Sequence, residues 1–190
     1  MLLFATAGEW ESWLENQPAD SPGLWLKLAK KGSETPSIDY ATALESALCF
    51  GWIDGQKRPY DESFWLQRFT PRTARSKWSR INRDRATALI EAGRMRPGGL
   101  REVERAREDG RWEAAYPSQS GATVPEDLQA ALDAEPRAAE FFATLDSANR
   151  YAVLYRVHAA KRADTRAKRI EKFVAMLNAH ETIHPRRDAK

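Results

Sequence analysis

Residues of the types that most often perform nucleophilic or metal chemistry are few in this sequence. Cysteine occurs once, at Cys49, and histidine occurs three times, at His158, His180 and His184. A cysteine nucleophile needs a nearby base or an electropositive setting. Cys49 instead stands at the end of a predicted helix, where the helix dipole disfavours a thiolate. We therefore predict that Cys49 is a buried and unreactive thiol.

The same scarcity bears on cofactors. One cysteine and three scattered histidines make no metal-ligand spacing, and the glycines of RMRPGG, residues 94–99, indicate a helix break rather than a phosphate-binding loop. The sequence therefore predicts no metal and no other cofactor. Because no pair of nucleophile and base is visible, it favours a binding protein over an enzyme and leaves that choice open.

The strongest candidate for a binding site lies in the segment WIDGQKRPYDESFWLQRF, residues 52–69. Two short alternating runs on either side of a turn predict a β-hairpin. Because the side chains of a strand alternate between two faces, we expect Ile53, Phe64 and Leu66 to point into the core. The opposite face then carries Trp52, Asp54, Gln56, Trp65, Gln67 and Phe69.

Aromatic side chains with a few polar groups among them are typical of small-ligand sites. We predict that this face, with an arginine at its rim, binds a small ligand or a peptide. The candidate residues are Trp52, Asp54, Gln56, Trp65, Gln67, Arg58 and Arg72. The alternative is that a helix covers the face and that Asp54 pairs internally with Arg58 or Arg68, since buried acids usually find a basic partner.

Charge is sorted along the chain, although the net charge is only +3. Residues 66–85 contain seven basic residues and one acidic residue, and residues 156–172 contain seven basic and two acidic residues. Basic segments with interleaved aromatics are typical of nucleic-acid contacts. The candidate contacts are Arg72, Arg75, Lys77, Trp78 and Arg80. The alternative is solvated surface with internal salt bridges, which the modest net charge favours.

Hydrophobic periodicity and end signals predict the elements that position these residues. We expect helices over residues 8–17, 40–50, 76–92 and 100–112, a strand over 24–31, the hairpin, and only helices after residue 125. Asp39 and Ser76 are expected to cap the second and third of these helices, and Gly51 to follow the end of the second.

These elements predict an α+β fold, mostly helical, with a small antiparallel sheet of about three strands and a C-terminal helical module. A linker of small residues near residue 120 divides the chain. We expect an α+β region over residues 1–120 and a helical region over residues 121–190, docked as one compact unit.

The composition is that of a globular protein, with 42% hydrophobic and 30% charged residues in a chain of 190. The first apolar run is too short for a signal sequence, and no stretch approaches the roughly 20 apolar residues of a membrane span. We therefore expect a cytoplasmic protein without a membrane span.

Several segments together resemble one known family. They are ALCFGWIDGQ, LQRFTPR, SKWSRINRDR and LIEAGRM, followed by VPEDLQAALDAEP and TRAKRIEKFVAML. Over about Leu24 to Leu177 the sequence resembles the YdeI/OmpD-associated, or bacteriocin-protection, family, and its C-terminal part is similar to the helical OmdA module. The resemblance implies a role in envelope stress or in protection against antimicrobial peptides, and transfers no catalytic residues. It marks as candidates Gly51, Trp52, Asp54, Gly55, Gln56, Gln67, Arg68, Phe69, Pro71, Trp78 and Asn82.

Overall fold

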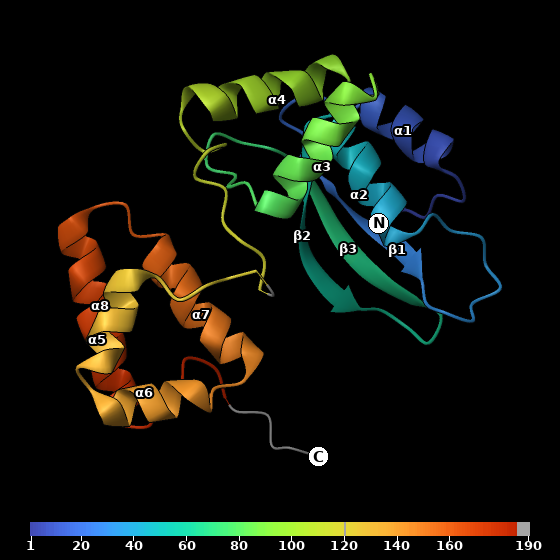
Figure 1. Ribbon diagram of the computed structural model, residues 1–190. Coiled ribbons are helices and arrows are strands. Elements are labelled where there is room, and N and C mark those ends of the chain that lie inside the picture. Colours follow the sequence, from blue (N-terminus) through green and yellow to red (C-terminus); the bar gives the residue numbers. More distant parts are fainter. Residues whose placement is uncertain (120, 186–190) are drawn as a thin grey trace. The chain divides into compact units, whose positions relative to one another are not determined.

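The computed structural model of the chain describes residues 1–119 and 121–185. These residues form eight α-helices and one three-stranded antiparallel sheet (Figure 1), which confirms the predicted α+β class. The chain divides into two compact units, Met1–Ala115 and Tyr116–Lys190. The docking of the two regions as one compact unit stays a prediction.

The N-terminal unit contains all three strands and four helices of the described chain. In order, the elements are α1 (Ala7–Glu15), β1 (Leu24–Ala29), α2 (Tyr40–Cys49), β2 (Trp52–Pro59), β3 (Phe64–Pro71), α3 (Arg80–Glu91) and α4 (Pro97–Glu108). The predicted cap of α2 is confirmed, because the Asp39 carboxylate accepts a hydrogen bond from the Thr42 amide at 2.7 Å. The cap of α3 is Ser79 and not Ser76, whose hydroxyl instead accepts from the Thr73 amide.

The sheet has the strand order β1-β3-β2, so the hairpin pairs with β1 through its second strand (Figure 1). Leu24 lies opposite Phe69, Leu26 opposite Gln67 and Leu28 opposite Trp65. Directly opposed residues share a face of the sheet. We call this the inner sheet face; it carries Leu24, Leu26, Leu28, Trp52, Asp54, Lys57, Trp65, Gln67 and Phe69.

The inner sheet face packs on the helices, so the prediction that the face of Ile53, Phe64 and Leu66 does so was wrong, although Phe64 and Leu66 are themselves buried. Three leucines of β1, together with Trp52 and Phe69, belong to one buried cluster with residues of α1 to α4. Burying this apolar surface outweighs the polar Gln67 among it. We call the opposite side the outer sheet face; it carries Trp25, Lys27, Ile53, Arg58, Phe64, Leu66 and Arg68.

The C-terminal unit is helical in its described part, as the sequence predicts. Its helices are α5 (Glu126–Asp133), α6 (Pro136–Ala143), α7 (Ser147–His158) and α8 (Ala163–Asn178). Apolar side chains from all four form a second buried cluster, including Leu128, Phe142, Val153 and Phe173. Within residues 1–119 and 121–185, no helix combines the length and the apolar character needed to cross a membrane.

Candidate functional site

The predicted hairpin site lies largely beneath the helices. Trp52 and Gln67 are buried, with 4% and 3% of their surface exposed, and Trp65 packs beside Tyr40 of α2 with ring centroids 6.0 Å apart. Arg58 is exposed, but on the outer sheet face. The alternative that helices cover the polar-aromatic face is therefore correct, and ligand binding by its residues stays a prediction.

Asp54 has a tyrosine partner and not the predicted arginine. The Tyr40 hydroxyl donates to Asp54 Oδ2 at 2.7 Å, joining the first residue of α2 to β2. Burial, and next the hydrogen bond to Asp54, raise the pKa of Tyr40 well above its ordinary value. Arg58 and Arg68 point away from Asp54 because alternation places them on the outer sheet face, where both guanidinium groups lie over the Trp25 ring.

A β-bulge changes the predicted pattern of faces in β2. The register shifts between Asp54 and Lys57, so that Lys57, and not Gln56, lies opposite Gln67. Gln67 Nε2 donates to the carbonyl oxygen of Gly55 at 3.0 Å and so satisfies a backbone group that the bulge leaves without a ladder partner. Gln56 is exposed. The two glutamines therefore do not face one shared ligand position.

The first basic segment does not present its five candidates on one surface. Arg72 and Trp78 are buried, with 5% and 2% of their surface exposed, and the Arg72 guanidinium lies 3.5 Å from the Trp78 ring centroid. Arg75, Lys77 and Arg80 are exposed. A stacked arginine and tryptophan in the interior hold the loop together, so two of the candidates are part of the core.

The second basic segment is partly neutralised inside its own unit, as predicted. Arg166 of α8 pairs with Asp127 of α5, with Nη2 and Oδ1 2.8 Å apart. Arg162 pairs with Asp164 at 3.2 Å. Hydrogen bonding to Arg166 lowers the pKa of Asp127 below its ordinary value.

The start of α4 forms one wall of a pocket in the N-terminal unit. The predicted helix break is confirmed, because α3 ends at Glu91, but Pro97, Gly98 and Gly99 already make the first turn of α4, so the predicted start of this helix at residue 100 was wrong. A Cβ atom on Gly99 would lie 2.3 Å from the carbonyl oxygen of Cys49. Gly51 has a φ of 81°, and a Cβ there would lie 2.7 Å from the Gly98 oxygen. The glycines thus allow the end of α2 and the start of α4 to touch through their backbones.

This pocket has a volume of about 440 Å³. It opens between the end of α1 and the loop after it, the start of β2, the end of β3 and the start of α4. We call it the arginine pocket. Its lining residues are Leu14, Glu15, Gln17, Pro18, Ala19, Phe50, Gly51, Trp52, Pro71, Arg72, Arg96, Pro97, Gly98, Arg101, Glu102 and Arg105.

The arginine pocket is electropositive. Its described lining contains four arginines and two glutamates, and one glutamate, Glu102, is already paired with Arg105. The first amides of a helix have no acceptor within the helix, and the helix dipole places partial positive charge there. The start of α4 adds to the guanidinium charge, so the pocket favours an anionic group.

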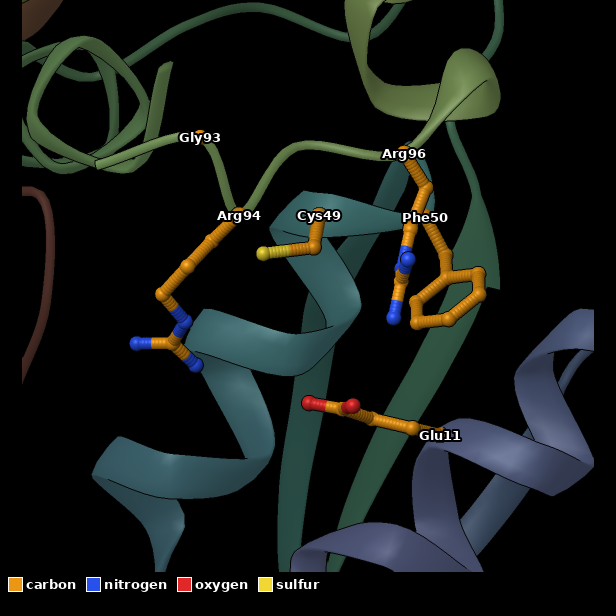
Figure 2. A pocket seen from close by; sticks show the side chains of 6 residues that line it. All are labelled: Glu11, Cys49, Phe50, Gly93, Arg94 and Arg96. Atoms are coloured by element: carbon orange, nitrogen blue, oxygen red, sulfur yellow. The ribbon is translucent and has the colours of Figure 1, made fainter. Parts of the chain in front are cut away.

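A smaller cavity of about 200 Å³ lies beside the arginine pocket and shares Phe50 and Arg96 with it. Figure 2 shows the Cys49 side chain here, with Arg94 and Arg96 on either side and Glu11 across the opening. Cys49 is 3% exposed, which confirms its predicted burial. Burial raises the pKa of the Cys49 thiol, although Arg94 and Arg96 act in the opposite direction, and a raised pKa disfavours the reactive thiolate.

Four lining residues of the arginine pocket were candidates from the sequence: Trp52 and Arg72 as ligand contacts, and Gly51 and Pro71 through the family resemblance. The contribution of α4 was missed. A proline followed by small residues is a signal for a first helical turn, and it was present at residues 97–99. The three residues Arg101, Glu102 and Arg105 follow within two helical turns. Which element lies opposite these three side chains depends on tertiary packing, so no local sequence signal could place them in the pocket. Within the described parts of the chain, no group of three metal-ligating side chains occurs.

The fold and the site define a class: an α+β unit with a helix-covered three-stranded sheet and a basic pocket, followed by a unit of helices. Residues 2–102 match the model of a family described as a domain of unknown function (DUF8412), and the chain belongs to this family. Residues 121–180 match the OmdA model, described as bacteriocin-protection, YdeI or OmpD-associated, which confirms the resemblance for the C-terminal region. Searches of curated proteins and of solved structures give no match.

Proposed function

We propose that this protein binds a small anionic molecule in the arginine pocket. The observation that carries the proposal is the convergence of Arg96 and Arg101 with the start of α4 on one opening, which is also lined by the stacked Arg72 and the paired Arg105. Guanidinium groups bind carboxylate and phosphate through paired, charge-assisted hydrogen bonds. The volume of about 440 Å³ lies within the roughly 300–1,000 Å³ that is typical of small-molecule sites.

The remaining walls indicate the rest of the ligand. Leu14, Phe50 and Trp52 contribute apolar surface beside the arginines. A molecule with an anionic head and an apolar or aromatic body uses both parts of the lining. The described lining residues include no hydroxyl, thiol, amine or imidazole side chain, so the site suits binding better than a nucleophilic reaction.

The C-terminal match supports a biological setting for this binding. The matched model is described as bacteriocin-protection, YdeI or OmpD-associated. On that basis the ligand is one that accumulates during antimicrobial-peptide or envelope stress, and the protein responds by holding it. A single cysteine in a buried position fits a reducing compartment, which supports placing this activity in the cytoplasm.

Isothermal titration of the full chain with 3-phenylpropionate and with its neutral amide tests the proposal. We expect the carboxylate to bind and the amide to bind at least tenfold more weakly, because charge-assisted hydrogen bonds contribute roughly 1.5–3 kcal/mol. Arg101→Ala should weaken carboxylate binding by about tenfold. The matched control Arg75→Ala removes an exposed arginine outside the pocket and should leave binding unchanged. Equal binding of acid and amide, or no effect of Arg101→Ala, would contradict the proposal.

A further inference from the structure

The outer sheet face combines cations and aromatic rings from all three strands. Lys27 comes from β1, Arg58 from β2 and Arg68 from β3. Trp25 and Phe64 lie on the same face, and Tyr60 follows β2 directly. Among the described strand residues of this face there is no Asp or Glu. The inner sheet face carries the acidic Asp54 as well as Lys57, so the cations without a neighbouring acid on the same face are those of the outer sheet face.

The cations are held in place by the rings beneath them. The Arg58 guanidinium lies 4.1 Å from the Trp25 ring centroid. Lys27 Nζ lies 4.4 Å from the Phe64 ring centroid and 4.7 Å from that of Tyr60. Arg68 Nη2 donates to the carbonyl oxygen of Pro22. A guanidinium stacked on one ring still offers its other face, and its N–H edges, to a ligand.

The outer sheet face lies outside the buried cluster that the helices of the N-terminal unit form with the sheet. Residues of α1 to α4 form one buried cluster with the inner sheet face, and Phe64 and Leu66 of the outer sheet face are not part of that cluster. Leu66 is nevertheless only 1% exposed; Arg58 and Trp25, from the strands on either side of β3, meet with guanidinium and ring centroid 4.1 Å apart. The surface is therefore a basic layer on an apolar floor.

From this arrangement we infer that the outer sheet face binds single-stranded nucleic acid. Phosphates need cations spaced along an extended path, and bases need flat surfaces on which to stack. Three strands carry the cations across the sheet, and Tyr60, which is 47% exposed, together with the guanidinium on Trp25 supplies stacking surfaces. This site is distinct from the arginine pocket: none of its residues lines that pocket. It also differs from the strip of residues 72–80 that the sequence analysis names as candidate nucleic-acid contacts.

Fluorescence anisotropy of the full chain with labelled dT12 tests the inference. We expect binding that weakens with salt, with a slope of log K against log salt of about −2, because each of three neutralised phosphates on a single strand contributes about 0.7. Arg58→Ala should reduce affinity by roughly tenfold and flatten the slope by about 0.7. Arg58→Lys keeps the charge and removes the planar stack, so it should retain the slope and still lose affinity.

Controls separate stacking from simple charge attraction. Arg80→Ala removes an exposed arginine outside the face and should leave dT12 binding unchanged, as should Arg101→Ala in the arginine pocket. An abasic strand of equal length and a poly-glutamate peptide should bind much more weakly than dT12. Equal binding of either probe, equal binding of anionic lipid vesicles, or an Arg80→Ala effect as large as that of Arg58→Ala would overturn the inference. Absence of dT12 binding would overturn this inference alone. Carboxylate binding in the arginine pocket is tested independently, because the two sites share no residue.

Discussion

The substitution Gly99→Ala tests whether the start of α4 and the end of α2 are in backbone contact beside the arginine pocket. Gly99 lies in the first turn of α4, and a Cβ there would stand 2.3 Å from the carbonyl oxygen of Cys49 and 2.7 Å from that of Leu48. Ordinary contact begins near 3.4 Å, so one backbone has to withdraw by about 1 Å. Backbone carbonyls cannot rotate away as side chains do, and Gly99→Ala therefore separates the start of α4 from the end of α2.

The expected magnitude follows from two opposing terms. Replacing glycine by alanine within a helix stabilises it by up to about 1 kcal/mol. Overpacking a tight contact costs about 1–3 kcal/mol, and here two of the three close atoms belong to backbone, the third being the end of the Met95 side chain. We expect Gly99→Ala to lower the free energy of unfolding by about 1–2 kcal/mol in net terms. Because the wall of the arginine pocket moves, carboxylate binding should weaken as well.

Urea unfolding followed by tryptophan fluorescence is the appropriate assay. All seven tryptophans lie within Met1–Ala115, so the signal reports the N-terminal unit. The matched control is Gly8→Ala in α1, where a Cβ would meet nothing within 4 Å. This change should stabilise the unit by about 0.4–1 kcal/mol. If Gly99→Ala were as stable as Gly8→Ala, the two helix ends would not be in backbone contact and the described pocket wall would be wrong.

Three further predictions concern the tyrosine pair, the cysteine and the C-terminal unit. Tyr40→Phe removes the hydrogen bond to Asp54 and should cost about 0.5–1.5 kcal/mol at pH 7. Because the folded-state pKa of Tyr40 is raised from 10.0, its contribution is complete below pH 10 and is lost as pH rises further; urea unfolding at pH 7–11 should show a flatter decline in the variant. Cys49 should react slowly with a thiol reagent in the native state, and rapid labelling would contradict its burial. Ile170→Ala and Phe173→Ala should each destabilise the helical unit by about 2–5 kcal/mol, measured as urea unfolding followed by far-UV circular dichroism. An unchanged unfolding transition would place α8 outside the core.

Several elements were predictable because their causes are local. Asp39 caps α2 through an amide only three residues away, and Gly51, the second residue after the end of α2, takes the positive φ that ends helices. The hairpin follows from two alternating runs joined by a short turn. These interactions join residues close in sequence, so reading the chain in order was sufficient to find them.

The orientation of the sheet could not be read in the same way. Alternation predicts two faces for each strand but does not say which face is covered, and the pairing of β1 with β3 placed the leucines of β1 beside Phe69 and Gln67. In addition, the bulge after Asp54 moves the following side chains of β2 to the face opposite to the one that simple alternation predicts. The partner of Asp54 was missed for the same reason, since Tyr40 reaches it from a helix.

By itself the sequence determined the α+β class, the positions of most helices and strands, and the family resemblance of the C-terminal region. These depend on hydrophobic period, capping residues and turns, which act over a few residues. Tertiary structure decided the two basic surfaces. The arginine pocket exists because glycines at 51 and 98–99, nearly 50 positions apart along the chain, let two helix ends meet. The outer sheet face became basic because burial of the more apolar face left Lys27, Arg58 and Arg68 on the other. Both outcomes depend on which surfaces bury the most apolar area together, and that quantity is defined only once distant segments are in contact.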